Sequence, residues 1–171
     1  NPMGTVVACG QLPGKTPRNM LGRLRTLARL LRYEVKALLE ASPEVLVASI
    51  REGLFWSHDG SPWSPSAIRT PGNRSAKSPM RMNVTNDGQI IWGEYGRNMN
   101  REPVSIYVSE DGGRTYEPVY NFEEGEIRHI HNVIPVRSGD GYWVLSGDYG
   151  QEPGIAHLSK DFSTLRWLAR G

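Results

Sequence analysis

The feature that most restricts the fold of this chain is one turn sequence, Ser109-Glu110-Asp111-Gly112-Gly113-Arg114-Thr115-Tyr116. It lies between two runs rich in β-branched and aromatic residues, 104–108 and 116–122. A short Asp/Gly turn between two such runs predicts a β-hairpin. The glycines can adopt the positive φ angles of a tight turn, and the Asp side chain can accept hydrogen bonds from the backbone N–H groups of the turn. The segment is therefore predicted to fold as strand, turn and strand.

The turn sequence recurs in shorter form. Ser57-His58-Asp59-Gly60 precedes it and Ser159-Lys160-Asp161 follows it, each about 50 residues away. An aromatic residue follows each copy: Trp63, Tyr116 and Trp167. An apolar run precedes each copy, and two of these runs end alike, in Gly93-Glu94-Tyr95-Gly96 and Gly147-Asp148-Tyr149-Gly150. A period near 50 with about four short strands per unit is typical of β-propeller blades.

The Ser-x-Asp-x-Gly-x-Thr-aromatic pattern resembles the Asp-box of the sialidase-type (BNR-repeat) β-propellers, and the resemblance covers residues 33–171. It implies that each box is a structural turn between the two outer strands of a blade, away from the active site. It also implies an all-β fold of about three four-stranded antiparallel blades. Propellers close with about four to eight blades, so the expected ring is incomplete.

The repeat predicts one domain, 1–171, with blades over 33–69, 80–121 and 128–171. The expected strands are 33–41, 44–50, 53–58 and 63–69; then 80–85, 89–95, 104–109 and 115–121; then 128–137, 142–148, 154–159 and 164–169. Residues 70–79 are expected to be a polar linker and 97–103 an enlarged loop. The N-terminal segment 1–32 is expected to contain a short strand over 5–9. A helix or helical loop is expected over 19–31, where leucines recur at helical spacing.

Charge and cysteine content exclude several classes of protein. A formal net charge of +2 over 171 residues gives no overall field that would attract nucleic acid or a membrane surface. No apolar run reaches the roughly 18 residues that a membrane span needs. The single cysteine, Cys9, excludes an internal disulfide framework, and Gly4–Gly10 lacks the charged lead of a signal peptide. We therefore expect an intracellular protein that has no nucleic-acid or membrane partner and no cofactor.

The resemblance also places a candidate site. In a sialidase-type propeller the first strand of each blade lines the channel, and the loops that lead into first strands and leave second strands form the site. On this basis the candidates for ligand binding are Arg81, Tyr95, Arg128 and Tyr149, and the candidates for acid–base catalysis are Asp148, Glu94, His129 and His131. Arginine binds carboxylate or phosphate through two parallel hydrogen bonds, and tyrosine rings stack on sugars while donating an O–H.

Each candidate also has a structural interpretation. Gly-Glu-Tyr-Gly and Gly-Asp-Tyr-Gly can be repeated turns whose carboxylates accept hydrogen bonds from backbone amides. Arg81 can bridge two blades through carbonyl groups. His129 and His131 share one strand face and could supply two metal ligands, but the sequence identifies no third, so we expect a hydrogen-bonded pair and no metal.

Three classes of function stay open. The first is a module that binds a carbohydrate or other polar anionic ligand on the channel face. The second is a glycoside hydrolase-like or lyase-like enzyme that uses Asp148 or Glu94 with His129 or His131. The third is a structural propeller that acts through protein partners. Sialidase activity itself is not expected, because the Arg-Ile-Pro motif of that family is absent and the adjacent Glu94 and Tyr95 should lie on opposite strand faces.

The incomplete ring carries a further expectation about assembly. Blades bury their apolar faces against neighbouring blades, so three blades leave two such faces uncovered. A two-fold homodimer would cover both, as would the remainder of a longer propeller.

Overall fold

The computed structural model describes residues 35–72, 74–150 and 152–171, and within them the chain is all-β, without a helix. The first sheet consists of β1 (Ala37–Ser42), β2 (Val45–Ile50), β3 (Gly53–His58) and β4 (Ser64–Pro65). The second consists of β6 (Pro79–Val84), β7 (Ile90–Glu94), β8 (Val104–Ser109) and β9 (Thr115–Phe122), with β5 (Ala67–Ile68) at its edge. The third consists of β10 (Ile130–Pro135), β11 (Gly141–Ser146), β12 (Gly154–Ser159) and β13 (Leu165–Arg170).

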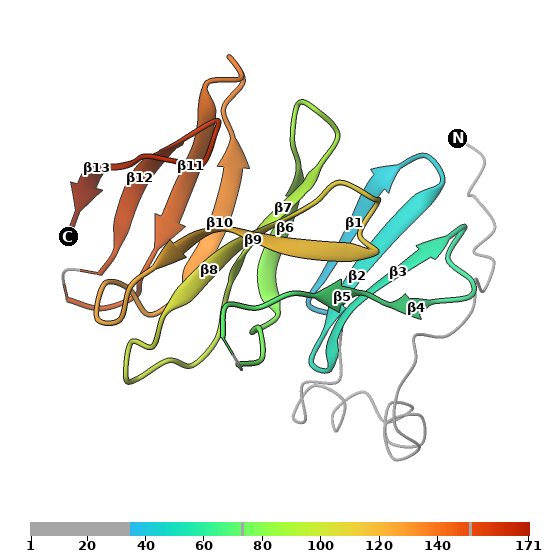
Figure 1. The fold of residues 1–171 in the computed structure, drawn as a ribbon, viewed down its shortest axis with the longest axis horizontal. Coiled ribbons are helices and arrows are strands. Elements are labelled where there is room, and N and C mark those ends of the chain that lie inside the picture. The colour runs from blue at the N-terminus through green and yellow to red at the C-terminus, as the bar shows by residue number, and fades with distance from the viewer. Residues whose placement is uncertain (1–34, 73, 151) are drawn as a thin grey trace, which may run out of the picture.

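Each sheet contains four consecutive strands, each antiparallel to the next, and the second sheet has β5 as a fifth strand. The sheets follow one another across the molecule in chain order, with the second sheet in the middle (Figure 1). The prediction of an all-β protein with three sheets of about four strands is confirmed for the described residues. No helix in that part of the chain is long and apolar enough to cross a bilayer.

The expected fourth strand of the first unit, 63–69, is wrong as a single strand. Its first half pairs with β3, and Ser66 N donates to Leu54 O at 2.9 Å. Ala67 N then donates to Arg114 O at 2.8 Å, and β5 runs parallel to β9. The chain therefore crosses from one sheet to the next between two neighbouring residues.

The other expected strands agree with the observed ones to within a few residues. Residues 33 and 34 of the expected first strand lie outside the described residues, and β1 is observed from Ala37. The other large differences are at both ends of β10, expected over 128–137 and observed over Ile130–Pro135, and at the end of β11, expected at residue 148 and observed at Ser146. The expected strand over 5–9 and the helical segment over 19–31 lie outside the described residues.

The middle sheet is buried on both faces, because successive residues of a strand point to opposite sides. Ile90 and Tyr107 pack in a cluster toward the first sheet, whereas Ile91 and Ile106 pack in a second cluster toward the third sheet. Every residue of β8 is buried. In the first cluster the rings of Trp92 and Tyr107 stack with their centroids 4.5 Å apart. Every residue of β7 is buried as well, so β7 and β8 form the centre of the described part of the chain.

The first strands of the three sheets are neighbours. Strand β6 lies beside both β1 and β10. Between β6 and β10, the Asn83 amide donates to Asn132 Oδ1 at 2.7 Å and to Val133 O at 2.8 Å. Between the first and second sheets, Ser78 Oγ donates to Ile50 O at 3.0 Å. Polar contacts therefore join the second sheet to each of its neighbours, close to β6.

The three Ser-x-Asp turns occupy equivalent places, each between the third and fourth strand of its sheet. In the turn after β8, Asp111 Oδ1 accepts hydrogen bonds from the backbone N–H groups of Arg114 (3.0 Å) and Thr115 (2.9 Å), and its Oδ2 accepts one from Thr115 Oγ1 (2.6 Å). Ser109 Oγ donates to the same carboxylate at 2.8 Å. The carboxylate thus closes the turn, as the sequence predicts.

The two outer copies differ in how far they keep this network. After β12, Ser159 and Ser163 donate to Asp161, and these hydrogen bonds lower the pKa of Asp161 to about 2. After β3, Ser57 Oγ donates instead to Pro62 O at 2.6 Å, and Asp59 adopts a positive φ of 58°. The first copy therefore keeps the position of the turn but not its carboxylate network.

We expect Asp111→Ala to lower the free energy of unfolding by about 1–3 kcal/mol, because it leaves N–H and O–H donors of the turn without their charged acceptor. Chemical denaturation measures the loss. Glu110→Ala, an exposed carboxylate in the same turn, should change stability by less than about 0.5 kcal/mol. Equal losses for the two variants would contradict the role of Asp111.

The same turn should make stability depend on pH. Burial raises the pKa of Asp111, but the hydrogen bonds from Thr115, Ser109 and Arg114 lower it by more, so the net shift is downward. A carboxylate with a depressed folded-state pKa stabilises the fold fully above its unfolded pKa, about 3.9, and loses that stabilisation as the pH falls through the folded value. The stability difference between the wild type and Asp111→Asn should therefore be constant above about pH 5 and shrink below about pH 4.

Candidate functional site

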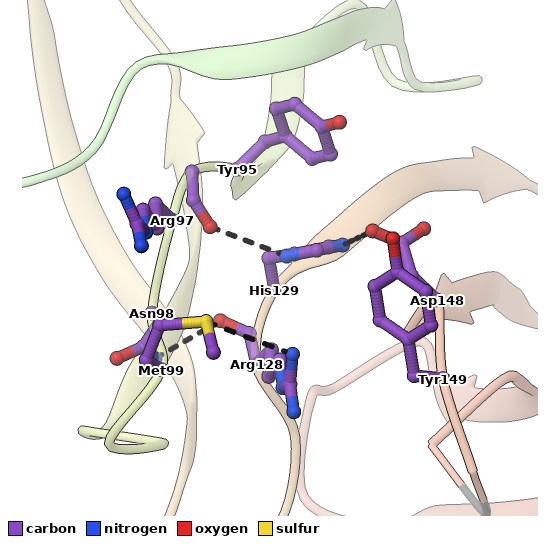
Figure 2. A pocket seen from close by; sticks show the side chains of 9 residues that line it. Tyr95, Arg97, Asn98, Met99, Arg128, His129, Asp148 and Tyr149 are labelled. Carbon is purple, nitrogen blue, oxygen red and sulfur yellow. Dashed lines mark hydrogen bonds and ion pairs between the residues drawn. The ribbon is translucent and has the colours of Figure 1, made fainter.

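A cavity of about 210 Å³ lies between the second and third sheets (Figure 2). Three segments form it: the loop that leaves β7, the residues that lead into β10, and the loop that leaves β11. Its lining consists of Tyr95, Gly96, Arg97, Asn98, Met99, Arg128, His129, Asp148 and Tyr149. Five of the eight candidate residues named from the sequence therefore line one cavity.

Two histidines and one aspartate meet at the wall of this cavity. His129 Nε2 lies 3.1 Å from Asp148 Oδ2, and His131 Nε2 lies 2.9 Å from Asp148 Oδ1. His129 is buried, whereas Asp148 is 37% exposed. One carboxylate thus faces both imidazoles, one oxygen to each ring.

Two local irregularities of the backbone bring Asp148 into contact with His129 and His131. The pairing of β10 with β11 shifts its register between Ile130 and Asn132, so His131 is an extra residue in the ladder. Such bulges re-aim a side chain. Gly147 follows the end of β11 with φ = 68°, a conformation that glycine adopts without strain, and it turns the next residue, Asp148, toward the histidines.

The orientation of both rings is fixed by their surroundings. His129 Nδ1 lies 3.2 Å from Gly96 O, and His131 Nε2 lies 3.0 Å from Gly147 O. The ring of Tyr95 packs against both imidazoles, with centroid distances of 4.8 and 5.5 Å. Burial lowers the pKa of His129; Asp148 opposes this effect, His131 adds to it, and the net shift is downward. Burial therefore favours the neutral imidazole at this position.

Arginine side chains form the other side of the cavity. Glu152, which is buried, accepts a hydrogen bond from Arg101 Nε at 2.6 Å and lies 3.2 Å from Arg128 Nε. The Arg128 guanidinium also lies over the ring of Tyr149, 5.6 Å from its centroid. Arg97 is exposed and forms no ion pair with any residue that the structure describes. Among the described residues, the cavity therefore has one arginine that is held by a carboxylate, Arg128, and one without an ion pair, Arg97.

Two of the predicted site residues lie elsewhere. Glu94 is 1% exposed and faces away from the cavity, where Arg74 binds it at 2.8 Å and the backbone N–H groups of Lys77 and Ser105 donate to it. Arg81 is exposed and lines a separate cavity of about 430 Å³ beside β1 and β6. The structure therefore does not bring Glu94 or Arg81 to the histidine pair.

The repeated Gly-x-Tyr-Gly segments play different parts. Glu94 is the last residue of β7 and points into the protein, whereas Asp148 follows the end of β11 and faces the cavity. Tyr95 is half-buried against the histidines, while Tyr149 is 68% exposed. The structural interpretation thus fits Glu94, whose carboxylate accepts hydrogen bonds from backbone N–H groups. It does not fit Asp148, which lines the cavity.

Several residues that bind the predicted site residues or position their loops were not named from the sequence. Arg74 falls in the segment read as a linker, and Glu152 follows the second Gly-x-Tyr-Gly segment. Asn98 is buried and donates to the carbonyl groups of Glu102 and Arg128, both at 2.9 Å, so it ties the loop after β7 to the start of β10. The unusual length of that loop, rich in Arg and Asn, was the one available signal, since enlarged loops often carry function.

Neither a family model nor any curated protein matches this sequence. What the chain does must therefore be argued from the geometry of the cavity between the second and third sheets. That geometry combines an arginine with no ion pair to a described residue, an arginine held by Glu152, two tyrosines and a His–Asp–His cluster.

Proposed function

We propose that the three sheets are consecutive blades of a sialidase-like β-propeller. Three observations support this proposal: the same four-strand order in each sheet, a Ser-x-Asp turn at the same place in each, and the adjacency of the first strands. The two-fold homodimer expected from an incomplete ring stays a prediction that follows from this architecture.

The function that the geometry supports best is binding of a carbohydrate or other polar anionic ligand in the cavity between the second and third sheets. The observation that carries it is the pair of arginines beside two tyrosines, with Arg97 unpaired among the described residues and Arg128 held by Glu152. Guanidinium groups bind carboxylates through two hydrogen bonds, and tyrosine rings contact sugar rings. At about 210 Å³ the cavity is smaller than the roughly 300–1,000 Å³ of drug-sized sites, so it suits a single acidic sugar ring.

The arrangement of carboxylates favours binding over glycoside hydrolysis. Most glycosidases need two carboxyl groups that flank the scissile bond, about 5–9.5 Å apart. Glu94 and Glu152 are both buried and bound to arginine. Among the residues that the structure describes, Asp148 is the one carboxylate that lines the cavity, and it faces two histidines. In the second hypothesis, acid–base catalysis, Asp148 and the two histidines are therefore the remaining candidates, and Glu94 is not one of them.

We expect the protein to bind an acidic monosaccharide more tightly than its neutral counterpart, and Arg97→Ala to weaken this binding about 10-fold or more. The reason is that hydrogen bonds to a charged group contribute about 1.5–3 kcal/mol. Isothermal titration with glucuronate, N-acetylneuraminate and glucose measures both differences. Arg97 suits the test because it is exposed and supports no other described residue.

Arg137→Ala, an exposed arginine in the turn between β10 and β11, serves as the matched control and should bind like the wild type. Equal affinity for glucuronate and glucose, or wild-type affinity in Arg97→Ala, would refute the assignment of the cavity to an anionic ligand.

A further inference from the structure

We propose that His129, His131 and Asp148 form a binding site for one divalent transition-metal ion, with zinc as the favoured metal. The ligand atoms would be Nε2 of each histidine and a carboxylate oxygen of Asp148. All of these atoms lie within 4.8 Å of one another. Tetrahedral zinc with bonds of about 2.0–2.2 Å places its ligand atoms about 3.3 Å apart. The distance from His129 Nε2 to Asp148 Oδ2, 3.1 Å, and that from His131 Nε2 to Asp148 Oδ1, 2.9 Å, are close to that separation.

The strongest argument is a buried nitrogen without a hydrogen-bond partner. Gly96 O can only accept a hydrogen bond, so the Nδ1 that contacts it at 3.2 Å carries the proton of the His129 ring. His129 Nε2 then presents a lone pair toward Asp148 Oδ2, which is also an acceptor. This nitrogen has no hydrogen-bond partner among the described residues, in a side chain that is 8% exposed. A buried acceptor that faces another acceptor is unfavourable, and a cation between the two removes the conflict.

The surroundings of the cluster are those that metal sites use. A histidine ligand usually donates its second N–H to a backbone carbonyl or a carboxylate, which fixes its tautomer and its orientation. The His129–Gly96 contact meets this description. Tyr95 packs against both rings and restricts them further. Asp148 is 37% exposed, so an ion can reach the cluster from solvent.

The ligand set restricts the choice of metal. Two imidazoles and one carboxylate suit zinc, iron or cobalt, whereas magnesium and calcium prefer oxygen ligands alone. Zinc with three protein ligands keeps an open fourth position, and such sites are the catalytic ones. In this protein the open fourth position would face the cavity, because His129 and Asp148 both line the cavity. His131 Nε2, which now contacts Asp148 and Gly147 O, must release its proton when the metal binds.

This site does not depend on the proposed anionic ligand. An ion held by the three residues would put a Lewis acid beside Arg97 and Arg128, so the same cavity could polarise a bound carboxylate or carbonyl group. The metal site can nevertheless be present in a protein that fails to bind acidic sugars, and the two proposals are tested with different probes.

The test uses the full chain without a polyhistidine tag, treated with EDTA and dialysed. Titration with zinc chloride, followed by calorimetry and by elemental analysis of the dialysed complex, should give one zinc per chain. Titration with cobalt(II) should give the visible absorption bands of a four-coordinate ion. His131→Gln and Asp148→Asn should each weaken zinc binding by at least about 10–100-fold, the effect of losing even an outer-shell partner.

The chain has four histidines, and the two outside the cluster provide the control. His58→Gln and His157→Gln should keep one zinc per chain with wild-type affinity. Circular dichroism establishes that each variant is folded before its affinity is compared. Absence of stoichiometric zinc and cobalt binding in the folded wild type would overturn the proposal. So would unchanged affinity in both His131→Gln and Asp148→Asn, or a nitrogen NMR signal that shows His129 protonated on both nitrogens in zinc-saturated protein.

Discussion

Glu94→Ala is expected to lower the free energy of unfolding by about 3 kcal/mol. Glu94 is 1% exposed, and its two oxygens accept from the Arg74 guanidinium and from the N–H groups of Lys77 and Ser105, all at 2.8 Å. Removing one partner of a buried ion pair leaves the other charge uncompensated, an effect of about 3–5 kcal/mol. Arg74 is 26% exposed, so water recovers part of its solvation and the lower end applies. Denaturant unfolding monitored by tryptophan fluorescence measures the change.

The chain offers a matched control for this prediction. Arg69 and Glu117 form an ion pair at 3.2 Å with side chains that are 82% and 50% exposed. Exposed pairs contribute at most about 1 kcal/mol, so Glu117→Ala should change stability far less than Glu94→Ala. A folded Glu94→Ala protein with the stability of Glu117→Ala, and with reduced ligand binding, would instead favour a functional role for Glu94.

The strands could be predicted because their signals are local. Alternating apolar residues, together with glycine and aspartate turns at equivalent places, specify each hairpin without reference to the rest of the chain. The β5 crossing could not be predicted in this way. It depends on Ala67 N reaching Arg114 O, and on Ser66 Oγ donating to Gly113 O at 2.6 Å, 47 residues along the chain. No pattern within residues 63–69 encodes a partner in another sheet.

The site could be predicted only in part, because its position follows from the repeats but the roles of its residues depend on contacts between sheets. Matching the repeats brought His129, His131 and Asp148 to one face, because loops at equivalent ends of neighbouring strands lie together. The sequence nevertheless identified no third metal ligand and treated Glu94 and Asp148 as equivalent. What separates them is tertiary: Arg74 binds the first carboxylate, and the positive φ of Gly147 turns the second outward. Neither property follows from the Gly-x-Tyr-Gly spacing.

Gly147→Ala is therefore expected to affect stability and the site together. Gly147 has φ = 68°, and an added Cβ would lie 2.2 Å from the backbone of Glu152. A left-handed conformation costs a non-glycine residue about 1–2 kcal/mol, and overpacking adds about 1–3 kcal/mol, so the expected loss is about 2–5 kcal/mol. Because the change moves the residue that aims Asp148 at the histidines, zinc affinity should fall as well.

Gly150→Ala separates the two causes within one loop. Gly150 has φ = 64°, nearly the same as Gly147, but an added Cβ would meet nothing within 4 Å. Gly150→Ala should therefore lower the free energy of unfolding only by the cost of the left-handed conformation, about 1–2 kcal/mol, and should keep the zinc affinity of the wild type. The excess loss in Gly147→Ala then measures the close approach of the Glu152 backbone, which also positions the buried carboxylate that holds Arg101 and Arg128. Equal losses of stability in the two alanine variants would mean that the Glu152 backbone does not restrict the space beside Gly147.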